Sequence, residues 1–275
     1  MSVLLSVKDL NISFRRYDGG LSPAVQGLTL ELAKGEGLAI VGESGSGKSV
    51  SALALARLLA EPPAVISGQI LLNGVDVNSL SREGLRAIRG RSIAYIFQEP
   101  GAALNPVFNI GSHMAEVLRL HRQDIHDREK ESIRWLHEVG ITDPERRLGE
   151  YPHQLSGGMQ QRVMIAMALA AQPDLIVADE PTTALDVTIQ RQIMELLARL
   201  KREHGTAILL ITHNFGIIRG VADRVGVMLR GSMVEQGPVE QVLKAPAHPY
   251  TRGLISCVPR LGQRQRRLPV YHSGA

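Results

Sequence analysis

Short apolar runs bounded by glycines or turn residues alternate with helical patterns along much of the chain. The runs at 37–42, 174–179 and 207–212 are apolar at nearly every position, which is typical of parallel strands buried on both faces. Residues 188–205 instead place their apolar side chains on one helical stripe, and Gly205 is a fitting C-terminal stop. This alternation predicts an α/β fold.

Two stretches depart from the α/β pattern. The start of the chain and residues 68–77 alternate between apolar and polar positions, with an Asn73-Gly74 turn signal, and this predicts antiparallel strands. The stretch at about 99–158 loses the strand pattern and carries helical segments. We therefore expect an N-terminal antiparallel β subdomain and a helical insertion within the α/β core.

The end of the chain changes pattern again. Beyond about residue 236 the sequence suggests two short helices interrupted by Pro246 and Pro249, and the last residues have few apolar side chains, as in a loose tail. The predicted organisation is one large domain over 1–235 and a short C-terminal extension with a tail over 236–275.

Composition sets limits on the class of protein. The 275 residues are 44% hydrophobic and 21% charged, with a net charge of +4, which is too small an excess to argue for nucleic acid. Cys257 is the single cysteine, so no disulfide framework or cysteine cage can form within the chain. We expect no signal peptide and no membrane span, because the longest apolar run, Val163–Ala171, is about half of what a span requires.

The strongest chemical signal is "GESGSGKS" at Gly42–Ser49, which follows a predicted strand and precedes a helical pattern. It matches the phosphate-binding loop G-x-x-x-x-G-K-S. Its glycines let backbone N–H groups converge on phosphate oxygens, Lys48 reaches the β and γ phosphates, and the Ser49 hydroxyl is a ligand for Mg²⁺. A simple glycine-rich turn is a poor alternative, given the Lys-Ser ending.

Two carboxylates follow the strand in "LIVADEP". Asp179 ends this strand and can hold Mg²⁺ through water, and Glu180 is suited to polarise an attacking water as general base, although the pair could simply cap the next helix. His213 ends a third strand and would lie within reach of the γ-phosphate. A lone histidine at a strand end is more often structural.

Three further positions carry weaker signals. Gln98 ends the strand-like "SIAYIFQ" and could equally be a polar strand cap. Phe14 could stack on an adenine, although an isolated Phe is usually part of the core. A second glycine pair follows Ser156 in "LSGGM", directly before a helical pattern, which is how a second anion-binding nest could be built.

Taken in order, "GESGSGKS", Gln98, "LSGGMQQR", "LIVADE", "ALD" at 184–186 and His213 resemble the ATP-binding subunit of an ABC transporter, over nearly the whole chain. "LSGGM" is decisive, because ordinary P-loop kinases and GTPases lack it. The resemblance implies two cassettes, head to tail, with each ATP between one chain's phosphate loop and the other chain's signature. The fold expected is therefore an α/β P-loop ABC-type ATPase core with the three additions described above.

The resemblance also implies roles for individual residues. Gln98 would contact Mg²⁺ or water and link to the transmembrane partner, Asp186 would form the dimer-contact loop, and His213 would be the switch histidine. Phe14 stands where the family usually has an adenine-stacking Tyr. The phosphate loop, the signature and the acidic pair are Gly42, Ser44, Gly45, Gly47, Lys48 and Ser49, then Ser156, Gly157 and Gly158, and finally Asp179 with Glu180 as the catalytic base.

Finer features resemble the oligopeptide, dipeptide and nickel importer branch, above all His-Pro-Tyr at 248–250 followed by a short helix and Val-Pro-Arg. Many members extend into a cysteine-rich tail that holds an iron-sulfur cluster. This chain has only Cys257 there, so we expect no cluster. The family's Thr-His-Asp switch has Asn214 in place of the Asp, so His213 could be held differently.

The expected cofactors are ATP and Mg²⁺. The expected partners are a second homologous cassette, with a heterodimer favoured, two transmembrane permeases and an extracytoplasmic solute-binding protein, with no nucleic acid. This places the chain at the cytoplasmic face of the inner membrane. Peptide and nickel or metal-chelate solutes both stay open, and a soluble ABC-type ATPase acting on nucleic acid or ribosomes is the alternative.

Overall fold

The computed structural model describes residues 2–183 and 185–257 of the chain. These residues form two compact units. The terminal unit combines the described residues up to Asn78 with those from Leu209 onward, and the middle unit comprises Ser79–Ile208. The predicted C-terminal tail lies outside the described residues, and the predicted boundary between residues 235 and 236 stays a prediction.

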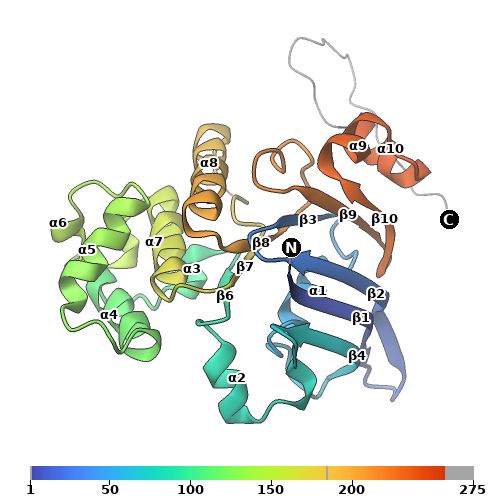
Figure 1. The fold of residues 1–275 in the computed structure, drawn as a ribbon, viewed down its shortest axis with the longest axis horizontal. Coiled ribbons are helices and arrows are strands. Elements are labelled where there is room, and N and C mark those ends of the chain that lie inside the picture. The colour runs from blue at the N-terminus through green and yellow to red at the C-terminus, as the bar shows by residue number, and fades with distance from the viewer. Residues whose placement is uncertain (1, 184, 258–275) are drawn as a thin grey trace. The chain divides into compact units, whose positions relative to one another are not determined.

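An antiparallel sheet of four strands dominates the first half of the terminal unit (Figure 1). Its order is β2-β1-β4-β5, where β1 is Val3–Arg15, β2 is Leu21–Ala33, β4 is Ala64–Leu72 and β5 is Val75–Asp76. Asn73 and Gly74 both have positive φ, 50° and 78°, and Leu72 pairs with Val75 across them. This is the two-residue turn that Asn-Gly favours, so the predicted antiparallel strands are confirmed.

A second group of strands in the terminal unit leads to the phosphate loop. β3 (Gly37–Val41) is buried at all five positions and runs parallel to β9 (Arg224–Leu229), which pairs antiparallel with β10 (Ser232–Pro238). The helix α1 (Lys48–Ala54) follows the loop and is shorter than the sequence suggested. It ends early because the backbone tightens after Ala54 and Arg57 takes a positive φ of 49°.

The last described part of the terminal unit contains two short helices, as predicted. These are α9 (Val239–Lys244) and α10 (Pro249–Ser256). Pro249 begins α10 rather than interrupting a helix, because a proline is tolerated at the first helical position, where its missing N–H has no partner to lose. A short 3₁₀ turn at Val77–Ser79 and the strand β8 (Ala207–Thr212) lie where the two units adjoin in the sequence.

The middle unit joins two parallel strands to a group of helices. β6 (Ile93–Ile96) runs parallel to β7 (Leu175–Asp179). Trp135, Leu136, Met114 and Leu118 are completely buried, and they form the helical core. The helices of this unit are α2 (Arg82–Ile88), α3 (Pro100–Ala103), α4 (Ile110–His121), α5 (Arg128–Glu138), α6 (Pro144–Arg147), the 3₁₀ turn Pro152–Gln154, α7 (Gly157–Ala170) and α8 (Val187–His204).

The helical stretch between β6 and β7 is confirmed, with α4, α5 and α7 gathered together in Figure 1. The predicted helix near the end of this unit is also confirmed, since α8 stops at Gly205, whose φ is 65°. Ile193, Leu196, Leu197 and Leu200 of its apolar stripe are buried.

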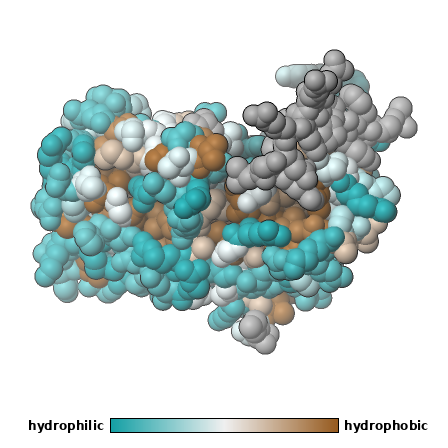
Figure 2. Space-filling view, turned by 90° about the horizontal axis from the view of Figure 1, so that it is seen from above, coloured by the Kyte–Doolittle hydropathy of each residue, from teal (hydrophilic) through white to brown (hydrophobic). Residues whose placement is uncertain are grey.

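Within the described ranges, no helix combines the length and the apolar character that crossing a membrane requires. The face seen in Figure 2 is mostly hydrophilic, with smaller hydrophobic areas among the polar residues.

Candidate nucleotide-binding site

The phosphate loop between β3 and α1 fits tightly against neighbouring backbone. A Cβ on Gly42 would overlap the carbonyl oxygen of Met228, and one on Gly47 would lie 2.5 Å from the carbonyl oxygen of Ala24. Gly47 also has a φ of 99°, which L side chains rarely adopt. These two glycines are therefore required by space and by backbone conformation, which gives the sequence motif a structural reason.

Lys48 is held inside its own loop and is only 4% exposed. Its ammonium donates hydrogen bonds to the carbonyl oxygens of Gly42 and Glu43, at 2.8 and 2.7 Å, and to the hydroxyl of Ser46 at 3.3 Å. Phosphate oxygens carry full negative charge and form stronger, charge-assisted bonds with an ammonium than neutral oxygens do. The loop thus presents a cation whose present partners a phosphate could replace.

The two predicted carboxylates sit at the end of β7 in the middle unit. Asp179 is the last residue of the strand, as expected, and Glu180 follows with a φ of 45°. A positive φ is uncommon for Glu, and such strained residues cluster at functional sites. The hydroxyl of Thr183 donates to Oε2 of Glu180 at 2.8 Å and fixes the direction of the carboxylate. Sequence reasoning missed Thr183, although it lies only three residues away.

The signature residues form the start of α7. The Ser156 hydroxyl accepts a hydrogen bond from the N–H of Met159 at 3.3 Å, so Ser156 is the N-cap, with Gly157 and Gly158 as the first helical residues. A Cβ on Gly158 would lie 2.9 Å from Cγ2 of Ile189 in α8. The signature thus packs directly against the first turn of α8.

Asp186 begins that same turn of α8. Its carboxylate accepts hydrogen bonds from the N–H groups of Thr188 and Ile189, at 3.0 and 2.9 Å, which makes it the N-cap. The sequence placed Asp186 and the signature about thirty residues apart. The structure brings them together, because Gly157 and Gly158 face Leu185 and Ile189 on either side of Asp186.

Gln98 and His213 both lie just beyond a strand. β6 ends at Ile96, so the expectation that Gln98 ends this strand is wrong; Gln98 is exposed, two residues further on. The chain leaves β6 at Phe97, which stacks on Tyr95 with ring centroids 5.8 Å apart. β8 ends at Thr212, and His213 is the exposed residue directly after it rather than its last residue.

The residue after His213 holds the local turn. The Asn214 side-chain oxygen accepts a hydrogen bond from the N–H of Gly216 at 2.8 Å, and its own N–H donates to the Thr212 hydroxyl at 3.1 Å. An Asp carboxylate could accept the same bond from Gly216. The Asn at this position is thus compatible with the usual turn. Phe14 is half-buried in β1, opposite Ser22 and Ala64 on the neighbouring strands.

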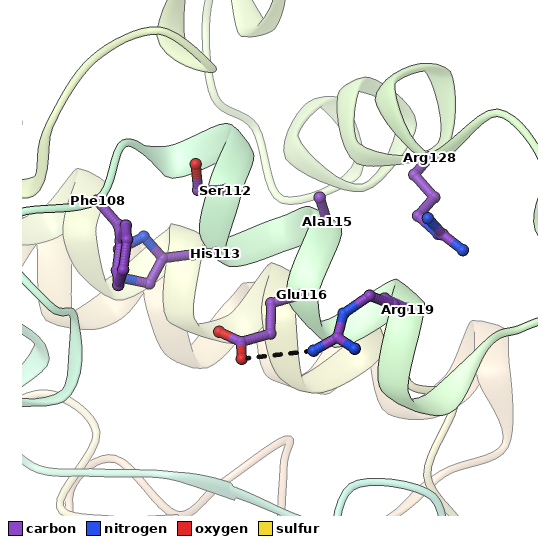
Figure 3. A pocket seen from close by; sticks show the side chains of 7 residues that line it. All are labelled: Phe108, Ser112, His113, Ala115, Glu116, Arg119 and Arg128. Carbon is purple, nitrogen blue, oxygen red and sulfur yellow. Dashed lines mark ion pairs between the residues drawn. The ribbon is translucent and has the colours of Figure 1, made fainter.

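A surface cavity of about 430 Å³ lies beside α4 (Figure 3). Phe108 precedes the helix and is 50% exposed, and Glu116 pairs with Arg119 at 4.0 Å. His113 is buried and supports this wall, because Nε2 accepts from the N–H of Asn105 at 3.0 Å while Nδ1 lies 2.8 Å from the carbonyl oxygen of Asn109. The lining residues are Phe108, Ser112, His113, Ala115, Glu116, Arg119 and Arg128.

The donor types at the predicted metal positions suit Mg²⁺, which prefers oxygen ligands. Ser49 offers a hydroxyl, Asp179 a carboxylate and Gln98 an amide oxygen. The phosphate loop also suits a nucleotide, since Gly45 has a φ of 79° and open space where a Cβ would lie, so a phosphate can approach the backbone there.

A phosphate loop after a buried parallel strand, with an acidic pair at the end of another, defines an α/β P-loop nucleotide-binding protein. The chain belongs to the ABC transporter family: that family's model matches residues 25–183. The model described as "Oligopeptide/dipeptide transporter, C-terminal region" matches residues 234–273. Both matches confirm the resemblance drawn from the motifs.

Curated relatives agree with this assignment. The oligopeptide transport ATP-binding protein OppD of Bacillus subtilis is 49% identical over 94% of this chain and 72% of its own length. The dipeptide transport ATP-binding protein DppD of the same organism is 48% identical over 95% of this chain and 78% of its own length. The glutathione import ATP-binding protein GsiA of Salmonella typhimurium is 49% identical over 97% of this chain, which spans only 45% of that relative.

Solved structures confirm the fold. The dimeric ATP-binding cassette MJ0796 in a post-hydrolysis state, bound to ADP and Pi, has a TM-score of 0.76 and 28% identity over 86% of this chain and 99% of its own. The cassette cbiO1 of Clostridium perfringens has a TM-score of 0.74 and 29% identity, over 89% and 92% of the two chains. The chain is therefore an ATP-hydrolysing cassette of the ABC type.

Proposed function

We propose that this chain hydrolyses ATP to drive the import of di- or oligopeptides through a membrane permease, which holds it at the cytoplasmic face of the membrane. The observation that carries the proposal is the union, in one chain, of the ABC transporter module and the oligopeptide/dipeptide transporter C-terminal region. Among the solutes left open by the sequence, the relatives' names favour peptides over nickel complexes. They also favour import over an action on nucleic acid.

The residues of the loop and the acidic pair have separate roles in this proposal. Lys48 binds the β and γ phosphates once its ammonium leaves the carbonyl oxygens of Gly42 and Glu43. Ser49, Gln98 and Asp179 hold Mg²⁺, which supplies charge neutralisation at the phosphates. The strained backbone of Glu180 and its bond from Thr183 support a role as the base that orients the attacking water.

The signature acts on a second nucleotide, held by a partner cassette. The signature residues Ser156, Gly157 and Gly158 lie beside the first turn of α8, which Asp186 caps. The groups proposed to bind the partner's ATP and to form the dimer contact are therefore packed together. A heterodimer is favoured because the importer branch that this chain resembles generally pairs two related but different cassettes. His213 completes the ATP contacts as the switch residue, and Phe14 stacks on the adenine.

The cavity beside α4 is the proposed docking place for a cytoplasmic segment of the permease. The Phe108 side chain lines this cavity, is half exposed and offers an apolar surface to a partner. An apolar segment with a polar end would fill the cavity and reach Arg119 or Arg128 at its rim.

Uptake by the complete transporter tests the function. Proteoliposomes that contain the permeases and both cassettes, with the solute-binding protein outside, should accumulate a labelled dipeptide only when ATP is enclosed in the lumen on the cassette side, and Glu180→Gln should abolish accumulation. Labelled Ni²⁺-chelate should not accumulate. Accumulation of the nickel complex alone would overturn the peptide assignment, and ATP hydrolysis stimulated by nucleic acid but not by permease would overturn import altogether.

A paired substitution tests the docking place. Phe108→Ser should remove permease-stimulated hydrolysis while the isolated cassette retains its basal rate. Tyr17→Ser is the matched control, because Tyr17 is also an exposed aromatic residue but lies far along the chain, in the turn after β1. If both variants lost stimulation equally, or if neither variant lost it, the cavity beside α4 would be excluded as the docking place.

A further inference from the structure

The phosphate loop is hydrogen-bonded to the C-terminal part of the chain. The N–H of Glu43, the second residue of the loop, donates to the hydroxyl of Tyr250 at 3.2 Å, although 207 residues separate them in the sequence. Tyr250 is the last residue of the His-Pro-Tyr sequence and the second residue of α10, and it is only 1% exposed. A buried tyrosine hydroxyl normally needs such a partner.

Glu43 links Tyr250 to Lys48 through a single residue. Its N–H is bonded to Tyr250, and its carbonyl oxygen accepts the bond from the Lys48 ammonium at 2.7 Å. The peptide group before Glu43 is thereby turned toward Tyr250. The backbone at the start of the loop is thus held at two points, through the N–H and the carbonyl oxygen of Glu43.

Tyr250 is itself held in place by bonds at the start of α10. The His248 Nδ1 atom accepts a hydrogen bond from the Tyr250 N–H at 3.2 Å and so caps the helix. The Glu235 carboxylate, on β10, accepts from the N–H groups of Ala247 and His248, at 2.7 and 3.1 Å. Pro249 fixes the first helical residue. The hydroxyl therefore meets the loop from a firmly anchored position.

We propose that Tyr250 is a positioning residue for nucleotide binding: its hydroxyl fixes the backbone of Glu43 and presets the phosphate loop, so that the C-terminal extension sets the affinity for nucleotide. Without this bond the Glu43 N–H loses its buried partner, and the start of the loop can rotate. Binding would then require the loop to be ordered again, which weakens affinity. This inference rests on the ATPase assignment of the family and needs neither the permease nor the solute.

The test removes the hydroxyl of Tyr250 and compares the effect with removal of the hydroxyl of the next residue, Thr251. Tyr250→Phe keeps the buried ring but deletes the hydroxyl bonded to Glu43. Thr251→Val is the control, because Thr251 is fully buried, follows directly in α10 and also loses a hydroxyl, but no bond joins it to the loop among those found in the described residues. The measurements on the full chain are the Kd of fluorescent ADP, the KM and kcat for ATP, and the thermal midpoint without nucleotide.

Tyr250→Phe should raise the Kd for ADP and the KM for ATP by about 3- to 10-fold, the range expected for loss of one net hydrogen bond, with kcat within about two-fold. Thr251→Val should leave both within about two-fold, whatever it does to the thermal midpoint. An unchanged Kd in Tyr250→Phe would make Tyr250 a packing residue only. An equal rise in both variants would assign the effect to general loosening of α10, and tighter binding would reverse the proposed direction; each of these three results overturns the inference.

Failure of this test is distinct from failure of the proposed function. Fluorescent ADP binds the cassette alone, so the result does not depend on peptide uptake. A chain that showed the Tyr250 effect but drove no peptide import would keep this inference and lose the other.

Discussion

Ser156 is observed as a helix N-cap and is proposed to contact the partner's nucleotide, and one pair of substitutions can separate these two roles. As the N-cap of α7 it accepts a bond from Met159, and its removal should cost about 1 kcal/mol of folding free energy. Ser81 makes the equivalent bond at the start of α2, from the N–H of Gly84 at 3.2 Å against 3.3 Å for Ser156. Ser156→Ala and Ser81→Ala should therefore lower the thermal midpoint by a similar amount, about 2–4 °C.

Only Ser156→Ala should impair hydrolysis. A hydrogen bond to a charged phosphate contributes about 1.5–3 kcal/mol, so turnover of the assembled transporter should fall by about 10- to 100-fold, against less than two-fold for Ser81→Ala. Azido-ATP trapped with vanadate and located by mass spectrometry should show the deficit mainly at the partner's phosphate loop. Equal turnover in the two variants, or a deficit confined to this chain's own loop, would refute the assignment of Ser156 to the partner's nucleotide.

Three further predictions concern the loop, the switch and the C-terminal anchor. Gly42→Ala should weaken ATP binding by about 5- to 150-fold, since its Cβ would overlap the Met228 carbonyl oxygen, and overpacking of this kind costs about 1–3 kcal/mol. Gly149→Ala, whose Cβ has ordinary space, is the control, and normal ATP binding by Gly42→Ala would contradict the tight fit. Asn214→Asp should keep the rate of ATP hydrolysis within about two-fold, because a carboxylate oxygen can accept the same hydrogen bond from Gly216. Asn214→Ala should lower the rate, because it removes the acceptor. Steady-state rates that fall equally in the two variants would refute this role of Asn214. Burial raises the pKa of the Glu235 carboxyl, but the nearby Thr251 side chain and the hydrogen bonds from the N–H groups of Ala247 and His248 outweigh it and leave the pKa below its ordinary value. Glu235 therefore stabilises the fold above the ordinary carboxyl pKa and loses this effect as pH falls through the lowered pKa, so Glu235→Gln should be less stable than the parent in thermal melts at neutral pH and equal to it in acid; a constant difference across pH would contradict the assignment.

Sequence patterns sufficed where the structure depends on neighbouring residues. The stripe of α8 repeats with helical spacing, and Gly205 takes the positive φ that ends the helix. Asn73 and Gly74 predicted a tight turn because few other residue pairs adopt two consecutive positive φ values. The phosphate loop was identified for the same reason, since its glycines and Lys48 serve a local geometry.

Patterns failed where a residue's environment comes from far along the chain. Nothing near Tyr250 in the sequence points to Glu43, and the buried position of its hydroxyl depends on how α10 is anchored. His113 likewise has an ordinary place in a helix, and its bond from Asn105 becomes evident only in the folded chain. The end of β6 before Gln98 was misplaced because Phe97 continues the apolar run although the strand has stopped.

The strained backbone of Glu180 could not be read from the sequence either. The motif identified the residue, but its positive φ and the bond from Thr183 are properties of the turn that follows β7. These two features explain how the carboxylate is oriented, which a motif alone does not.

The most direct test of the account is the turnover of Glu180→Gln. The Gln side chain has the same shape, and its oxygen can still accept the bond from Thr183, so the turn after β7 should stay intact. The account predicts ATP binding within about three-fold of the parent and hydrolysis reduced by about 100-fold or more, the range of a lost general base. Near-normal hydrolysis by a folded, ATP-binding Glu180→Gln chain would contradict the central claim that Glu180 activates the attacking water.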